Sequence, residues 1–259
     1  MASIARVPLA VETRAPGGET NAYAIGERGG VLLDPAARSP GLDSLADARE
    51  VAHVLVTHTH PDHVGSVAEY ASHTDATAWA HADHRDRFVH ATGIEPDRVF
   101  EDGTELGAGN GDLTVLETPG HAPDHVSLAT EEGILVGDLA VATGSVAITA
   151  GEGHVGNYLD SLRQLREMSP EKLFPAHGSV IDDPDETLKR LIEHRLEREQ
   201  RVLAAVRDGA RDLGAITDAA YEKDVSSVRD LAEGTVAAHI EQLARDGEVT
   251  WNGERAEPV

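Results

Sequence analysis

Short apolar runs that end in glycine or proline recur along the first two thirds of the chain, and this pattern predicts a series of buried strands. Four of these runs are each followed by residues that can bind a metal ion. They are Val51–Val56, Thr114–Thr118, Gly133–Val136 and Leu173–Ala176. If neighbouring strands run in the same direction, their carboxyl ends bring these residues to one edge, where α/β folds usually bind ligands.

The pattern changes to helical spacing after residue 180, which predicts a separate module over 181–259 behind a first domain over 1–180. Asp182 and Asp183 are start signals for a long amphipathic helix from Pro184. The pattern then predicts two further helices and a hairpin, over Ala215–Tyr221, Glu233–Arg245 and Glu248–Gly253. Helix, short helix, helix and hairpin follow one another as in a winged helix.

The residues after the first run form a dense polar cluster, His-x-His-x-Asp-His, that contains His58, His60, Asp62 and His63. Imidazole and carboxylate groups bind zinc, iron or manganese. A histidine-rich surface loop is the alternative explanation in a chain with fourteen histidines. That alternative does not account for His121, Asp138 and His177, which follow the three later runs.

This motif order resembles the metallo-β-lactamase superfamily, and Asn21–Tyr23 and Val31–Asp34 resemble its first hairpin. The resemblance implies an α/β fold, a four-layer αββα sandwich, here with a small, mainly helical, winged-helix-like carboxyl-terminal module. It also implies two metal sites that share one bridging carboxylate. The first metal would be held by His58, His60 and His121, the second by Asp62, His63 and His177, and the bridge would be Asp138.

Two divalent ions roughly 4 Å apart can share a hydroxide that attacks an acyl or phosphoryl centre, because each ion lowers the pKa of bound water toward about 7. We expect zinc, with iron or manganese as alternatives. Asp62 is expected both to bind metal and to orient the nucleophile. The sequence contains no Gly-x-Ser-x-Gly motif, the pattern that would indicate a serine nucleophile.

Two further histidines are candidates for supporting roles. His125 lies four residues after His121 and is expected either to support a ligand from behind, to face the substrate, or to serve the fold alone. His154 lies in a glycine-rich stretch, Gly151–Gly156, after the third ligand strand, and we expect a flexible loop that lines the substrate pocket.

The carboxyl-terminal module resembles that of the lactamase-B-like 2 branch of the superfamily, as do His194-Arg195, Arg198-Glu199 and Asp124-His125. A winged helix suggests nucleic-acid binding, but the third predicted helix lacks a basic face, so this role is disfavoured without being excluded. The module is expected instead to shape the substrate pocket or to form contacts in a homodimer.

The expected activity is hydrolysis of a small-molecule thioester or ester, as in the glyoxalase II-like branch, whose ligand set is reproduced here. A metal-dependent endoribonuclease is the runner-up, followed by a β-lactamase-type amide hydrolase. A persulfide dioxygenase with a single iron has a similar motif. A flavo-diiron oxidoreductase is disfavoured because His60 stands where that group carries glutamate, and a purely structural metal site is disfavoured because such sites are usually closed Cys and His cages.

The net charge of the chain indicates the environment in which the protein works. Among 259 residues, 46 acidic side chains oppose 22 basic ones, of which three are lysine, and the net charge is −24. The acids are dispersed along the chain, which indicates screening by concentrated salt, as in a halophilic cytoplasm. The amino terminus lacks a signal pattern, no apolar run is long enough to span a membrane, and without cysteine there are no disulfides.

Overall fold

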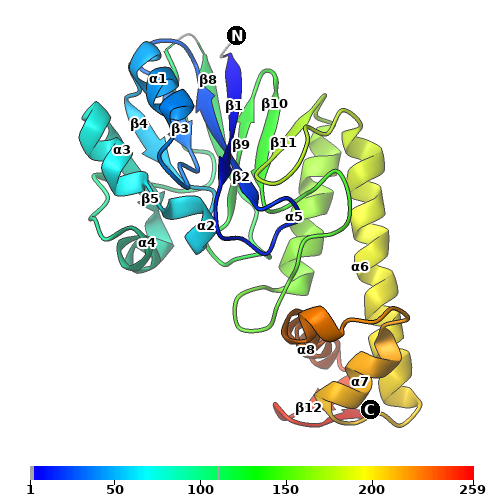
Figure 1. Cartoon of the computed structure of the whole chain (residues 1–259). Helices are drawn as coiled ribbons and strands as arrows, with labels where there is room; N and C mark the ends of the chain where they lie inside the picture. The colour runs from blue at the N-terminus through cyan, green and yellow to red at the C-terminus, as the bar shows by residue number, and fades with distance from the viewer. Residues whose placement is uncertain (1–2, 110) are drawn as a thin grey trace.

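Two twisted sheets pack face to face in a computed structural model that describes residues 3–109 and 111–259 (Figure 1). Residues 1 and 2 of the predicted first domain lie outside the described residues. The first sheet has the order β1 (Ile4–Ala10), β2 (Glu19–Ile25), β3 (Val31–Leu33), β4 (His53–Leu55), β5 (Thr77–His81), β6 (Arg98–Phe100). The second has the order β11 (Leu173–Pro175), β10 (Gly133–Gly137), β9 (Val126–Thr130), β8 (Asp112–Glu117), β7 (Glu105–Gly107).

Helices cover both outer faces of the sheets, so the layers follow the predicted αββα order. On the first sheet lie α1 (Pro40–Ala48), α2 (Pro61–Val64), α3 (Val67–Thr74), the short 3-10 turn η1 (Ala82–His84) and α4 (Arg85–Thr92). On the second sheet lie α5 (Val155–Met168) and α6 (Pro184–Arg207). Apolar cores fill the three spaces between the layers. Strands such as β3 and β10 are buried along their whole length, which explains their continuous apolar runs.

The ligand-bearing strands belong to both sheets, which is a more complex arrangement than one set of parallel neighbours. β4 pairs in parallel with β3 and β5 in the first sheet. In the second sheet β8 and β10 are each antiparallel to β9, and β10 is parallel to β11, so β8, β10 and β11 share one direction. Their carboxyl ends reach the same edge of the sandwich as the end of β4.

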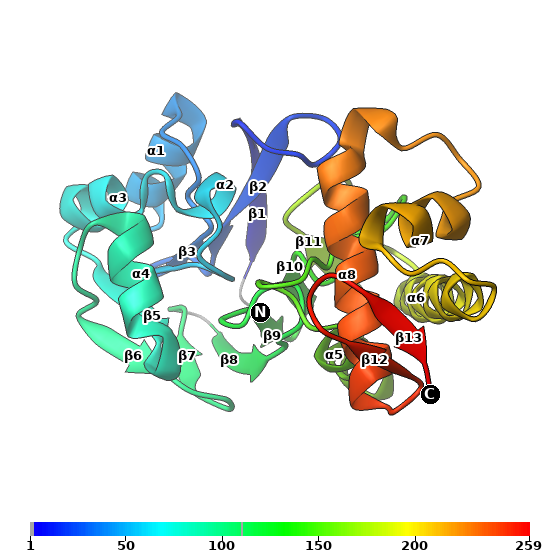
Figure 2. The same cartoon turned by 90° about the horizontal axis from the view of Figure 1, so that it is seen from below.

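The carboxyl-terminal module, predicted over 181–259, contains α6, α7 (Leu213–Ala220), the 3-10 turn η2 (Ser226–Val228), α8 (Arg229–Arg245) and a hairpin of β12 (Val249–Trp251) and β13 (Ala256–Pro258). Figure 2 shows α7, α8 and this hairpin gathered beside the far end of α6. The order of elements is as the sequence predicts. Several bounds differ: α7 begins two residues and α8 four residues earlier than expected, α7 ends one residue earlier, and the hairpin extends to Pro258. None of the helices in the described ranges has the length and hydrophobicity to cross a membrane.

The long helix α6 takes part in two cores. Leu188 and Leu191 in its first half pack with α5 in the core outside the second sheet. Val202 and Val206 in its second half pack with α7 and α8 in a separate core. Its start is as the sequence predicts, since the Asp183 side chain accepts a hydrogen bond from the backbone of the first turn. The pattern change near residue 180 therefore coincides with the start of a helix that both parts share.

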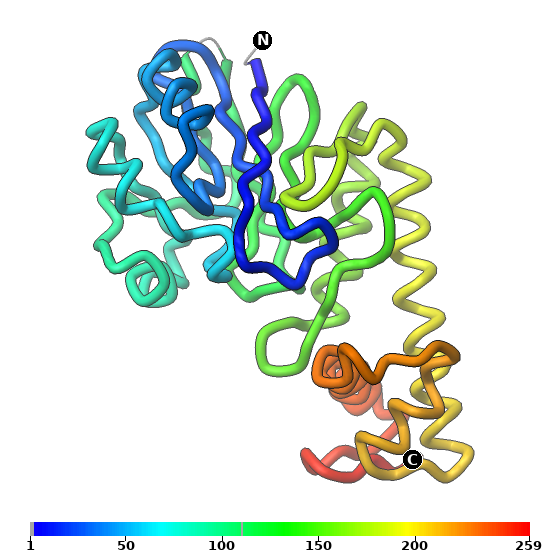
Figure 3. The backbone as a smooth tube through the Cα atoms, in the orientation of Figure 1, coloured from blue at the N-terminus to red at the C-terminus, as the bar shows by residue number. Residues whose placement is uncertain are grey.

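The segment between β10 and α5 differs from the flexible loop that its glycines suggest. Figure 3 shows it as a green loop that descends toward α8, where the Ala150 amide donates to the Gly234 carbonyl at 3.0 Å. From α6, Arg190 donates to the carbonyls of Val141, Ala142 and Gly144, and Arg195 donates to that of Val146. The carboxyl-terminal module therefore holds this segment, which we call the β10–α5 loop (residues 138–154), in place.

Candidate metal centre

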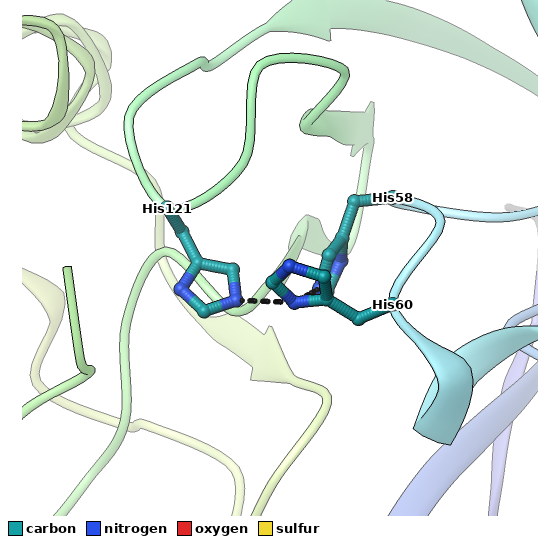
Figure 4. A group of neighbouring side chains, drawn as sticks. All are labelled: His58, His60 and His121. Atoms are coloured by element: carbon teal, nitrogen blue, oxygen red, sulfur yellow. Dashed lines mark hydrogen bonds between the residues drawn. The ribbon is translucent and has the colours of Figure 1, made fainter. Parts of the chain in front are cut away.

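Three histidine nitrogens converge at the end of β4. His60 Nδ1 lies 2.9 Å from His58 Nε2 and 3.0 Å from His121 Nε2 (Figure 4). His58 is buried, and burial together with the neighbouring histidines lowers its pKa well below the ordinary value, so its ring is neutral and keeps a lone pair. These three residues form the first of three groups whose ligand atoms lie within 4.8 Å of one another.

A second cluster contains Asp62, His63 and His177. His177 Nε2 lies 3.6 Å from Asp62 Oδ2, and His63 Nε2 lies 3.8 Å from Asp62 Oδ1. Asp138 faces both clusters: its Oδ2 is 3.5 Å from His121 Nε2, and its Oδ1 is 3.3 Å from His177 Nε2 and 3.8 Å from His63 Nε2. The structure thus brings all seven predicted ligands together, with Asp138 between the two clusters.

Local backbone features deliver these side chains. Pro61 is at the first position of α2, where it needs no amide hydrogen, and this short helix presents Asp62 and His63. Gly120 and Gly137 precede His121 and Asp138, and both have positive φ, at +138° and +48°. A Cβ on Gly120 would lie 2.3 Å from Tyr158, so only glycine fits at this turn.

The nitrogens that face away from the cluster have partners of their own. His58 Nδ1 lies 3.1 Å from the Thr57 hydroxyl, which donates to Asp34, and His63 Nδ1 lies 3.1 Å from Asp34 Oδ2. His121 Nδ1 and His177 Nδ1 donate to the carbonyls of Ala147 and Glu19, at 2.9 and 2.8 Å. These contacts give each of the four rings an outward hydrogen-bond partner and leave the inward nitrogen available to a metal ion, as in metal-binding histidines.

Polar atoms without partners show that the centre suits cations. His63 Nε2, Asp138 Oδ1 and His177 Nε2 are buried and have no hydrogen-bond partner within the described residues. Burial would raise the pKa of Asp138, but the surrounding imidazoles hold it far below its ordinary value, so the carboxylate is charged. Buried imidazole nitrogens and a buried carboxylate that face one another without hydrogen-bond partners are costly, and bound cations would satisfy them, so this donor set fits two divalent ions.

His125 lies behind the centre, and both of its ring nitrogens contact protein atoms. It is buried, its Nδ1 donates to the Thr118 carbonyl at 3.0 Å, and its Nε2 accepts from the Asp138 amide at 3.1 Å. Burial, with a contribution from His121, lowers its pKa to about 3. Of the expected roles, the geometry therefore corresponds to support of a ligand from behind.

His154 makes a local contact at the start of a helix. It caps α5, with its Nδ1 accepting from the Asn157 amide at 3.1 Å, and the helix α5 was not expected from the sequence. The residue of this loop that faces the metal centre is Glu152, whose Oε2 lies 3.6 Å from His60 Nε2. The capping contact explains the placement of His154 at the start of α5.

Other site residues escape the sequence reasoning. Asp34, at the end of β3, accepts from the Thr57 amide at 2.7 Å and hydroxyl at 2.9 Å. Its place directly after a buried strand is the same signal that identified Asp138. Thr13 donates to Asp62 Oδ2 at 2.5 Å across 49 residues of sequence, and no local pattern marks such a contact.

Comparisons with known proteins agree with this geometry. The family model described as metallo-beta-lactamase superfamily matches residues 15–177. A Beta-lactamase-like protein 2 homolog of Drosophila melanogaster is 31% identical over 211 residues, which are 76% of this chain and 69% of the relative. An Atrochrysone carboxyl ACP thioesterase of Aspergillus fumigatus is 28% identical over 256 residues, covering 90% of this chain and 58% of the relative. A metallo-beta-lactamase family protein of Thermus thermophilus shares the fold with a TM-score of 0.78 at 21% identity, over 99% of this chain and 98% of that one.

Proposed function

Because the chain belongs to the metallo-β-lactamase superfamily, we propose that it is a hydrolase that uses two divalent metal ions. The observation that carries the proposal is the position of Asp138, whose two oxygens face two separate clusters of ligand atoms. A purely structural site would need a single closed cage of ligands. Two clusters that share one carboxylate correspond to an open catalytic pair.

We assign the first metal to His58, His60 and His121 and the second to Asp62, His63 and His177, bridged by Asp138. When bound, the metals supply a water of lowered pKa and a Lewis acid for the oxygen that gains charge. Zinc suits these nitrogen and oxygen ligands best, with iron or manganese as alternatives.

The protein groups have separate tasks in this proposal. The charge of Asp138 offsets part of the positive charge at the centre and fixes the distance between the clusters. Asp62 binds the second metal and orients the nucleophile. The Thr13 hydroxyl, which donates to Asp62 Oδ2 at 2.5 Å, holds this carboxylate in one rotamer. His125 keeps the backbone of Asp138 in place through its amide.

We propose a small thioester or ester as the substrate, as in the glyoxalase II-like branch. The thioesterase of Aspergillus fumigatus supports this class because it matches 90% of the chain, including most of the carboxyl-terminal module. An endoribonuclease is the second candidate, disfavoured by the −24 charge and by α8, where Arg229 is engaged with Asp218 and Glu233. A β-lactamase-type amide hydrolase or a persulfide dioxygenase with one iron ranks below these.

The dispersed acidic residues support a working environment of concentrated salt, and we propose the cytoplasm of a salt-adapted cell. We propose that the carboxyl-terminal module borders the substrate site, because it holds the β10–α5 loop that carries Glu152. Contact between two copies of the chain is the alternative role of this module.

The test is hydrolysis of a hydroxyacyl thioester by protein kept in molar KCl and loaded with zinc. Released thiol can be followed with a disulfide reagent, because the chain has no cysteine of its own. Turnover should disappear in Asp138→Ala and persist in Asp160→Ala, a control at an exposed position of α5. No turnover by folded protein with two bound metals would remove the thioester assignment, and cleavage of single-stranded RNA or oxygen uptake with a persulfide would replace it.

A further inference from the structure

Among the metal-centre histidines of the described chain, His60 is the one whose outward nitrogen meets a side chain from the β10–α5 loop. Its Nδ1 faces His58 and His121, so its Nε2 carries the hydrogen and points to Glu152 Oε2, 3.6 Å away. The other four rings have hydroxyl, carboxylate or carbonyl partners at 2.8–3.1 Å. Glu152 stands in the corresponding place for the fifth ring.

Glu152 is held in this position by Arg87 of α4. Arg87 donates two hydrogen bonds to the Glu152 carboxylate, at 2.8 and 3.3 Å. Paired donation of this kind fixes a carboxylate in direction as well as distance. Burial would raise the pKa of Glu152, but the Arg87 guanidinium lowers it, so the carboxylate remains charged beside His60.

The contacts continue until they return to the histidine segment. Arg87 Nε lies 3.5 Å from Asp124 Oδ1, and Asp124 is buried. Asp124 Oδ2 accepts from the Thr59 amide at 3.0 Å and from the Thr59 hydroxyl at 2.6 Å. Since Thr59 precedes His60, the chain of contacts is a closed ring. Its members in order are Thr59, Asp124, Arg87, Glu152 and His60.

We propose that Glu152 is a positioning residue that orients His60 and sets the affinity of the first metal, with Arg87 and Asp124 holding it in place. The inference rests on the proposed two-metal function. Carboxylate partners of metal-bound histidines raise ligand basicity and fix the tautomer, and their loss typically weakens metal binding about 10- to 100-fold. Because the β10–α5 loop is held by α6 and α8, the carboxyl-terminal module contributes to the metal site through this residue.

The test measures metal binding separately from activity. Cobalt is titrated in molar KCl in competition with a chelator, and binding is followed by the visible spectrum. The titration gives the dissociation constants of both metal sites, and it is carried out on three proteins: the parent protein, Glu152→Gln and Glu167→Gln. Glu152→Gln keeps the shape and removes the charge. Glu167→Gln is the matched control, since Glu167 is exposed near the end of α5. We expect one of the two metals to bind about 10- to 100-fold more weakly in Glu152→Gln alone.

Arg87→Gln should weaken the binding of the same metal, by a smaller factor than Glu152→Gln does. The inference is overturned if Glu152→Gln binds both metals with the parent's constants. It is also overturned if the variant loses both metals together and its metal-free form melts at a lower temperature, since Glu152 would then only support the fold. A parent protein that binds no metal, or one metal, would instead remove the two-metal function itself, so the two failures are distinguishable.

Discussion

Asp34→Asn tests the support behind the metal centre. Asp34 is 1% exposed, and its carboxylate accepts from the Thr57 amide and hydroxyl and from His63 Nδ1. An asparagine oxygen can keep the bond from the Thr57 amide, but its NH₂ group would then face the other two donors. The substitution therefore leaves at least one buried donor without an acceptor.

The expected cost follows from those lost bonds. Each buried group left without its partner costs about 1–3 kcal/mol, so Asp34→Asn should lower the free energy of unfolding by about 2–4 kcal/mol. The backbone is not the cause, because Asp34 has φ +49° and asparagine tolerates that left-handed conformation well. Since Asp34 orients His63 directly and His58 through Thr57, metal affinity should also fall, by about 10- to 100-fold.

Urea unfolding in molar KCl, with metal and with chelator, measures the first effect, and zinc competition measures the second. Asp75→Asn is the matched control: Asp75 also has a left-handed φ, +55°, but is exposed at the end of α3. It should change stability by no more than about 0.5 kcal/mol. A loss below about 1 kcal/mol in Asp34→Asn, with unchanged zinc affinity, would refute this account of Asp34.

Four further outcomes are expected. Asp138→Ala should lose metal and activity together, and retention of two metals by elemental analysis would contradict the bridging assignment. His125 takes up a proton near pH 6.5 in the unfolded chain, whereas its pKa in the folded chain is about 3, so the free energy of unfolding should fall as the pH drops through this window. Urea unfolding at pH 7 and pH 5 should therefore show a smaller loss of stability in His125→Gln than in the parent protein. Dialysis from molar KCl into dilute buffer should abolish cooperative unfolding measured by circular dichroism, and full stability there would rule out salt adaptation. Truncation after Asp182 should give aggregates in size-exclusion chromatography, because it uncovers the apolar face of α5 on which Leu188 and Leu191 pack; a monomeric fragment would contradict this.

The sequence was most informative where ligands follow strands directly. His121, Asp138 and His177 were identifiable because an apolar run and a turn signal precede each one, and the His-x-His-x-Asp-His cluster is contiguous. Their division between two sheets was not predictable, because the direction of β9 relative to β8 and β10 depends on pairing rather than on residue pattern.

Other features of the site depend on contacts between distant residues. Arg87 and Glu152 are 65 residues apart, and neither stands beside a ligand in sequence. Helix α5 had a usable signal, since Tyr158, Leu162 and Leu165 recur at helical spacing, but the glycines before it suggested a loop. The loop itself is ordered by Arg190 and Arg195 from α6, and this support is visible only in three dimensions.

Because α6 belongs to two cores, its position limits where the carboxyl-terminal module can be exchanged between related genes. With 24 residues the helix is about 36 Å long, enough to reach from one core to the other. A gene fusion joined at residue 181 would transfer the whole helix, and Leu188 and Leu191 would then have to match a foreign α5. A junction within the helix, between Leu191 and Val202, would leave each apolar patch with its native partners. Exchange of the carboxyl-terminal module between relatives is therefore expected to succeed within this helix and to fail at its start.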